Sequence, residues 1–214
     1  MLEQLQQHLH GINRSEAGYD IRQFLVTDPH LARILSGGNL LTHGGETLLL
    51  KEDENGLALS LYLDEAILER LGSNEPLEAL KSGLLDELCK VIEGLSHFNY
   101  VAWRASRDHS ITLLELEMQA EVDKFVSLMQ LAQEERDVEL SNALHGRLFD
   151  ENRYHDHLTE RQLERYRAAN GFAARFCRIL GPRLRNGSNR VLPELRRFYR
   201  MSLGDKVSHI HATA

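Results

Sequence analysis

The chain has 214 residues, of which 42% are hydrophobic and 27% charged, and its formal net charge is −7 at pH 7. These values are ordinary for a globular protein that buries a sizeable core. No run of eighteen apolar residues occurs and the polar N-terminus lacks the order of a secretory signal, so the sequence predicts no membrane-spanning helix and no exported protein. Cys89 and Cys177 lack CxxC spacing, which favours a reduced, cytoplasmic location.

Residues 1–36 are expected to form short helices. Ser15 is the expected N-cap of a segment running into "EAGYDIRQFLV", and Asp28 with Pro29 begins the helix "HLARIL". The run "SGGN" at 36–39 then ends the helical pattern.

A β-hairpin is predicted between residues 46 and 63. Its two strands, 47–51 and 57–63, flank Asn55-Gly56, the dipeptide preferred by a type I′ turn. Every second residue from Leu57 to Leu63 is leucine, which indicates one buried face. Because a lone hairpin is marginal in water, a third strand or a helix must cover these leucines.

The rest of the chain is expected to be helical. A capping box at Thr159 and Gln162 begins one segment, and Gly181-Pro182 is expected to end it. The expected helices cover about 64–72, 75–105, 111–137, 138–149, 159–180 and 193–201. The sequence therefore predicts a mainly α protein, a bundle of about six to eight helices with one small β-hairpin. We expect a single domain, 1–214, with an N-terminal subregion at 1–72 and a helical core with a basic C-terminal segment at 73–214.

Two polar residues stand in the middle of apolar helix faces. Glu121 interrupts the face that runs from Ile111 to Ala132, and Asn170 interrupts a similar face in the helix 159–180. Burying either without a partner is costly. Glu121 could pair with Asn170 or with an arginine or tyrosine of a neighbouring helix, could stay protonated, or could bind a metal with a histidine. The structural interpretation is a polar network that fixes helix register, and the functional one is an acid/base or metal site.

Glu93 and His97 are the other candidates for chemistry. They stand four residues apart in one helix, so both could reach one ion, although Asp86, Lys90 and Arg104 share their face and make it typical of a solvated surface. The catalytic candidates are Glu121, His97 and Glu93, and the metal-ligand candidates are Glu117, Glu121, His97 and His155. The spacings HExxH and paired ExxH do not occur, and no motif identifies a cofactor.

The charge is unevenly distributed along the chain. Residues 1–157 hold 13 basic and 28 acidic residues, whereas residues 158–214 hold 12 basic and 4 acidic ones, and eleven of those twelve are arginine. Guanidinium groups bind phosphate through two N–H groups at once. The candidates for phosphate or nucleic-acid contacts are Arg183, Arg185, Arg190, Arg196, Arg197 and Arg200. Alternatively, the basic helices pack beside acidic ones, and the overall acidity opposes nucleic-acid approach.

Three classes of function follow. The preferred one is an association, regulatory or accessory module that forms a homo-oligomer or binds a protein partner, and it predicts an exposed apolar patch. The alternative is an enzyme or metal-binding protein with a carboxylate and histidine site inside the bundle. The third is a phosphate or nucleic-acid binder that uses the C-terminal arginines, which is not favoured. Whether the protein is an enzyme is left open.

Overall fold

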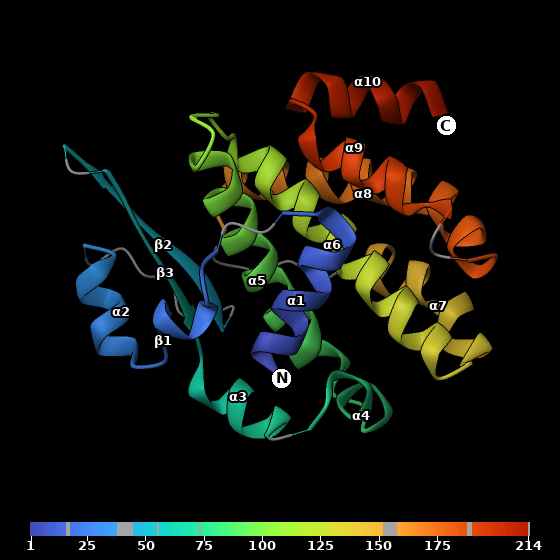
Figure 1. Ribbon diagram of the computed structural model, residues 1–214, viewed down its shortest axis with the longest axis horizontal. Coiled ribbons are helices and arrows are strands. Elements are labelled where there is room, and N and C mark those ends of the chain that lie inside the picture. The colour runs from blue at the N-terminus through green and yellow to red at the C-terminus, as the bar shows by residue number, and fades with distance from the viewer. Residues whose placement is uncertain are drawn as a thin grey trace. The chain divides into compact units, whose positions relative to one another are not determined.

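The computed structural model describes residues 1–15, 18–37, 45–54, 56–72, 74–151, 158–187 and 190–213 (Figure 1). The described residues form ten α-helices and a three-stranded sheet. The expectation of a mainly helical protein with a small β element is confirmed. The helix count exceeds the predicted six to eight, and the strands belong to a mixed sheet and not to a simple hairpin.

The chain divides into two compact units, and each is described by itself. Unit 1 comprises residues 1–11 and 15–110, and unit 2 comprises residues 12–14 and 111–214. The single domain with an inner boundary near residue 72 stays a prediction.

Unit 1 contains the sheet and the helices around it. Its elements are α1 (Leu2–Asn13, without its last two residues), a 3₁₀ turn (Ile21–Gln23), β1 (Leu25–Val26), α2 (Pro29–Leu35), β2 (Glu46–Asp53), β3 (Gly56–Leu63), α3 (Glu65–Leu71), α4 (Pro76–Lys81) and α5 (Leu85–Ala105). Asp28 caps α2 and Asp64 caps α3 through side-chain hydrogen bonds to backbone N–H groups, as aspartate does at helix starts.

The strand order of the sheet is β1-β3-β2. β2 pairs antiparallel with β3, with Leu48 opposite Leu61 and Leu50 opposite Leu59, and β1 pairs parallel with β3 over two residues only. Opposite residues point to the same face of a sheet. The leucines of both strands therefore share one face.

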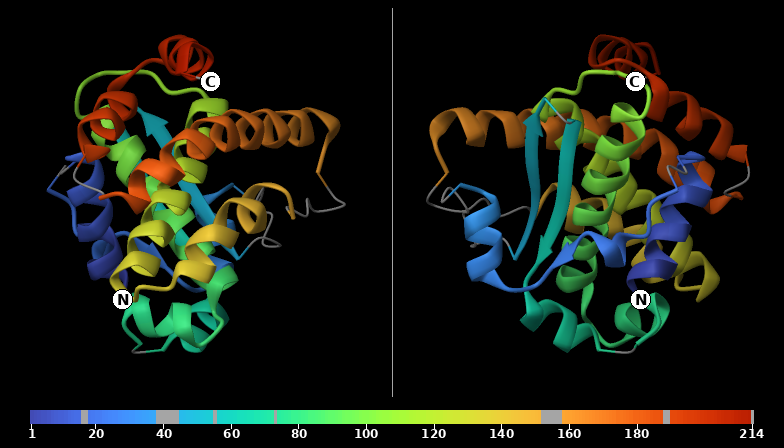
Figure 2. Two further views of the ribbon diagram at one scale, coloured as in Figure 1. Left: turned by 90° about the vertical axis from the view of Figure 1, so that its right-hand side faces the viewer. Right: turned by 60° about the vertical axis from the view of Figure 1, so that its left-hand side comes forward.

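Helices cover the two faces of this sheet unequally. On the leucine face, Leu61 lies against Gly94 of α5, and Figure 2 shows α5 alongside the two long strands. On the other face, Ala32 of α2 packs with Val26, Leu49 and Tyr62. The turn end of β2 and β3 projects away from α5 in Figure 1. The predicted leucine face is therefore only partly covered within the described part of unit 1.

Two expectations for unit 1 were wrong. The segment after Ser15 forms a 3₁₀ turn and a short strand among its described residues, not a helix. The expected helix 75–105 is split into α4 and α5, because Gly83 adopts a positive φ of 76° that ends α4. The Asn55-Gly56 turn lies partly outside the described residues.

Unit 2 is helical throughout its described residues. Its helices are α6 (Leu113–Glu134), α7 (Val138–Phe149), α8 (Glu160–Arg185), α9 (Leu192–Arg200) and α10 (Leu203–Thr213). The predicted capping box of Thr159 and Gln162 begins α8. α6 packs against α7 and α8, and α10 packs against α8. Phe176 and Phe198 stack with ring centroids 4.2 Å apart where α8 meets α9.

The end of α8 and the presence of α10 differ from the expectation. Pro182 lies inside α8, which continues to Arg185, so Gly181-Pro182 does not end the helix. Proline removes a hydrogen bond from a helix but does not always stop it. α10 was not predicted, although Ser202 and Asp205 form a reciprocal capping pair at its start.

Candidate functional site

Glu121 is paired inside its own helix. Its Oε1 accepts a hydrogen bond of 2.9 Å from Nζ of Lys124, and its side chain is 15% exposed. Asn170, one of the partners considered for Glu121, donates to the backbone oxygen of Phe149 at 3.1 Å, at the end of α7. Glu121 is thus a half-buried carboxylate beside a lysine, although its apolar neighbours on the same face, Met118, Val122 and Phe125, are buried.

A buried polar network lies elsewhere in unit 2 and was missed from the sequence. Its residues are Asn13, Gln119, Asp123 and Lys206. Asp123 Oδ1 accepts hydrogen bonds of 3.0 Å from both Asn13 Nδ2 and Gln119 Nε2. Gln119 Oε1 in turn accepts one of 2.7 Å from Lys206 Nζ. The glutamine therefore connects a buried carboxylate to a buried ammonium.

Lys206 is the one lysine of the basic C-terminal segment, and it is fully buried. Its Nζ also lies 5.0 Å from the centroid of the Phe198 ring. A buried ammonium is tolerated only when its donors are satisfied and a negative charge is near. Together these contacts tie the end of α1, the middle of α6 and the start of α10 within unit 2.

Cys177 is unsuited to nucleophilic chemistry. Burial raises the pKa of its thiol well above the ordinary value, and the negative charges of Glu121 and Asp123 raise it further. The thiolate is the reactive form of cysteine, and this environment disfavours it. Cys177 is therefore a small apolar core residue.

Two of the candidate phosphate-binding arginines bind backbone oxygens. Arg196 donates from Nε to the oxygen of Ile12 at 3.1 Å, and Arg200 donates to the oxygens of Asn13 and Arg14. Desolvation and the charges of Arg14 and Arg200 lower the pKa of Arg196. Cations at the carbonyl end of a helix stabilise it, so both groups cap α1.

The other candidate arginines are divided between pairing and exposure. Arg183 forms an ion pair with Glu194, whose other oxygen lies 3.1 Å from His209 Nε2. Arg185, Arg190 and Arg197 are exposed. The hypothesis of a phosphate or nucleic-acid site stays a prediction, with fewer donors available for it than the sequence suggested.

His97 of unit 1 lies near two glutamates of the same unit, Glu46 and Glu93. His97 Nδ1 lies 3.8 Å from Glu46 Oε2, and a ring nitrogen of His97 lies within 4.8 Å of a carboxylate oxygen of Glu93. His97 is 5% exposed, so the expectation of a solvated face was wrong at this position. Glu46 was not predicted as a neighbour of His97, because it lies in a strand 51 residues earlier in the chain and no local pattern links the two.

Glu117 and His155 are the other two metal-ligand candidates. Glu117 of unit 2 is buried, and one of its oxygens lies 3.9 Å from Arg165 Nε. His155 lies outside the described residues. The roles of all these residues as ligands or catalysts stay predictions.

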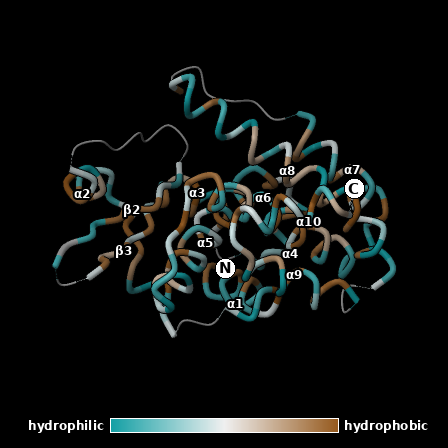
Figure 3. Tube along the Cα trace, turned by 90° about the horizontal axis from the view of Figure 1, so that it is seen from above, coloured by the Kyte–Doolittle hydropathy of each residue, from teal (hydrophilic) through white to brown (hydrophobic). Residues whose placement is uncertain are grey.

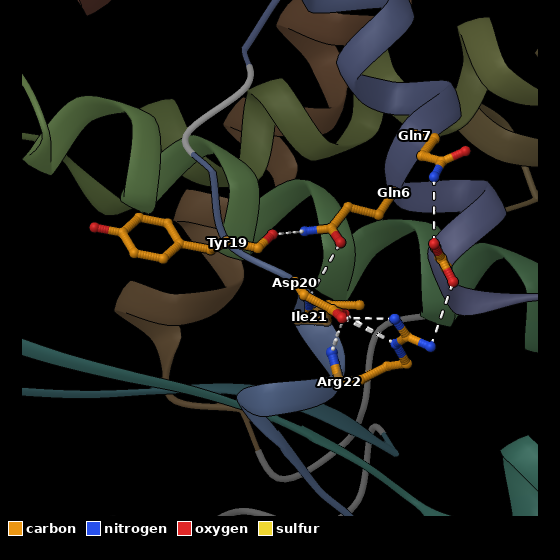
Figure 4. Close-up of polar contacts among 7 residues, drawn as sticks. Gln6, Gln7, Tyr19, Asp20, Ile21 and Arg22 are labelled. Carbon is orange, nitrogen blue, oxygen red and sulfur yellow. Dashed lines mark hydrogen bonds and ion pairs between the residues drawn. The ribbon is translucent and has the colours of Figure 1, made fainter.

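A second polar network holds the segment before the sheet of unit 1 (Figure 4). Gln6 of α1 donates to the oxygen of Tyr19 and to Oδ1 of Asn99, both at 3.1 Å, and accepts from the backbone N–H of Ile21 at 3.1 Å. A shallow depression of about 280 Å³ lies beside it, lined in part by Asp20. The hydrogen bonds from Arg22 lower the pKa of Asp20. Its charge is thus already compensated, and we assign the network to folding.

Comparison with protein-family models, with curated proteins and with solved structures finds no match for this chain. Among the described helices, none is both long and apolar enough to cross a membrane. The function is therefore inferred from the surface and the sites described above.

Proposed function

We propose that the protein is an association module that pairs with a second copy of itself through the sheet of unit 1. The observation that supports the proposal is a set of leucines on β2 and β3 that no described element fully covers. We name it the leucine strip, and it consists of Leu48, Leu50, Leu57 and Leu59. Figure 3 shows hydrophobic stretches along both strands.

Exposure increases along the strip toward the turn. Leu61 and Leu63 are fully buried, Leu48 and Leu59 are half-buried, and Leu50 and Leu57 are 48% and 41% exposed. A single exposed leucine is ordinary, but neighbouring apolar side chains on one face of a sheet often mark an interaction site. Burying the exposed part of one such leucine contributes about 1 kcal/mol.

The edge of the sheet offers a second means of association. In the described residues, β2 has a strand on one side only, because the order is β1-β3-β2. An edge strand presents backbone N–H and C=O groups that another strand can pair with. An eight-residue strand with aliphatic side chains beside the edge is long enough for such pairing.

A second copy of the chain fits both features. Pairing β2 with β2 around a two-fold axis would extend the antiparallel sheet and place the two leucine strips next to each other. Two-fold dimers are the commonest homo-oligomers, and their interface uses the same patch on both copies. An aliphatic strip is complementary to itself, so no differently charged partner is required.

The test is the molar mass of the protein measured by light scattering across a range of concentrations. Wild-type protein should change from monomer to dimer, and the double variant Leu50→Ser, Leu57→Ser should stay monomeric in the same range. Each substitution occurs twice in a two-fold dimer. The expected loss is therefore about 4 kcal/mol, or roughly a thousandfold in Kd.

Ile34→Ser is the matched control, because Ile34 is 75% exposed on α2 and does not belong to the leucine strip. It should leave the dimer unchanged. A wild-type protein that stays monomeric at all concentrations would contradict the proposal, and so would a double variant that dimerises as the wild type does.

A further inference from the structure

We propose that one face of α8 binds the phosphate backbone of double-stranded nucleic acid without reading its sequence. This face carries four exposed arginines, which we name the arginine row: Arg167, Arg175, Arg178 and Arg185. Only the last of them belongs to the set of phosphate-binding candidates predicted from the sequence. The proposal concerns unit 2 alone, so it does not depend on association through the sheet of unit 1.

The arginine row follows one side of a long helix. α8 has 26 residues, and Figure 2 shows it as one continuous helix. At 3.6 residues per turn and a rise of 1.5 Å per residue, the four arginines lie within about 80° of arc and extend over about 27 Å. The buried residues Ala173, Phe176 and Leu180 lie on the opposite side of the helix. The arginine row is therefore a line of positive charge on the outer face of α8.

The arginine row has no charge partner among the described residues. From Arg165 to Arg185 the sequence contains six arginines and no aspartate or glutamate. None of the four side chains forms an ion pair or a hydrogen bond within the described part of the chain. Solvated helix faces usually carry charges of both signs, and like charges one turn apart, such as Arg175 and Arg178, destabilise a helix. An anionic ligand would relieve this repulsion.

The backbone of α8 is open in the middle of the arginine row. Gly171 lies one turn from both Arg167 and Arg175. Apart from its chain neighbours and its own helix backbone, no described atom lies within 4 Å of a Cβ atom built there. Glycine inside a helix is intrinsically unfavourable, and packing does not require it at this position. Its effect is to leave room for a phosphate group to approach the helix between two arginines.

The side chains of this face select the class of ligand. A guanidinium group binds two phosphate oxygens at once. Within the described part of unit 2, the exposed large apolar side chains are Leu113 and Val138, and neither belongs to α8. A lipid surface needs apolar side chains that insert, and a single strand needs aromatic side chains on which bases stack. A duplex needs only backbone contacts, and its phosphates follow one another along a stiff rod.

The net charge of −7 limits the affinity but does not prevent the contact. At physiological salt, exposed charges separated by more than about 8 Å are largely screened from each other. The contacts between arginines and phosphates act at a shorter distance than this. We therefore expect a Kd of about 1–100 μM at physiological salt, the range of binding that does not depend on sequence.

The test is fluorescence anisotropy of a labelled DNA duplex of about 20 base pairs, titrated with full-length protein from about 50 to about 200 mM salt. For wild-type protein, the logarithm of the binding constant should fall with the logarithm of the salt concentration with a slope of about −3.6, or about −0.9 for each arginine of the row. The double variant Arg175→Gln, Arg178→Gln should bind at least tenfold more weakly at about 50 mM salt, with a slope of about −1.8.

The matched control removes two exposed arginines outside the row, Arg33→Gln with Arg136→Gln. It should change the affinity by less than about twofold, because it leaves all four phosphate contacts in place. Far-UV circular dichroism checks that both double variants are folded, as expected for substitutions of exposed side chains.

Three results would overturn the proposal. The first is that wild-type protein does not bind the duplex. The second is that the folded variant Arg175→Gln, Arg178→Gln binds it as the wild type does. The third is that single-stranded DNA, polyglutamate or phosphatidylserine vesicles, at equal concentration of charge, displace the labelled duplex more effectively than unlabelled duplex does.

Discussion

Replacing Lys206 with methionine should destabilise unit 2 by about 2–3 kcal/mol. The methionine keeps the length and most of the packing of the lysine stem, but it removes a charge-assisted hydrogen bond to Gln119, worth about 1.5–3 kcal/mol. It also removes the attraction between the ammonium and the Phe198 ring, worth about 1 kcal/mol. The gain from no longer burying an ammonium offsets part of this loss.

Urea denaturation at pH 7, followed by circular dichroism, measures the effect. Lys81→Met is the control, because Lys81 is exposed and its loss should change stability by no more than about 0.5 kcal/mol. Adding Asp123→Asn to Lys206→Met should recover at least about 1 kcal/mol, since the buried carboxylate is then no longer charged. If Lys206→Met is as stable as the wild type, the assignment of Lys206 as the cation of this network is refuted.

Three further predictions concern single side chains. Gln6→Leu should destabilise unit 1 by about 1–3 kcal/mol in urea denaturation, because it leaves the N–H of Ile21 without its acceptor; unchanged stability would contradict this. In a Cys89→Ser background, Cys177 should react with a thiol reagent at pH 8 only on unfolding, because its pKa is raised; rapid reaction of folded protein would refute this. Burial lowers the pKa of His8, so unfolded protein binds more protons below about pH 6.5. The free energy of unfolding should therefore fall on acidification through that window, and it should fall less in His8→Gln. An equal dependence on pH in the two proteins would contradict this prediction.

The sequence predicted the helix starts better than the helix ends. Asp28 and Thr159 are caps in the structure because a side-chain oxygen that binds nearby N–H groups acts locally. Pro182 was misinterpreted because a proline inside a helix is tolerated when the surrounding structure supports it. α10 could have been found from Ser202 and Asp205, whose spacing is that of a cap.

The polar sites were less predictable than the helices. A helical wheel identified Glu121 as unusual, but it could not show that Lys124, one turn away, would pair with it. The contacts of Gln119 with Lys206 and of Glu46 with His97 join residues distant in sequence. No local pattern encodes such contacts, so only the folded structure reveals them.

The alternating leucines of β3 were correctly predicted to lie on one face of a sheet. The extent to which other elements cover that face was not predicted. Alternation shows that Leu57 and Leu61 point to the same side, but not how far a covering helix reaches. In the structure Leu61 is buried and Leu57 is 41% exposed. The proposed association follows from that difference.

Backbone amide hydrogen exchange of β2, measured at low and high protein concentration, tests the pairing of two copies most directly. Amides at the open edge of β2 should exchange quickly when the protein is dilute and at least tenfold more slowly when most chains are dimers. The amides of α2 serve as the internal reference and should not respond to concentration. If the β2 amides exchange at the same rate at low and at high protein concentration, in samples shown to contain dimers, the pairing of two copies through β2 is contradicted.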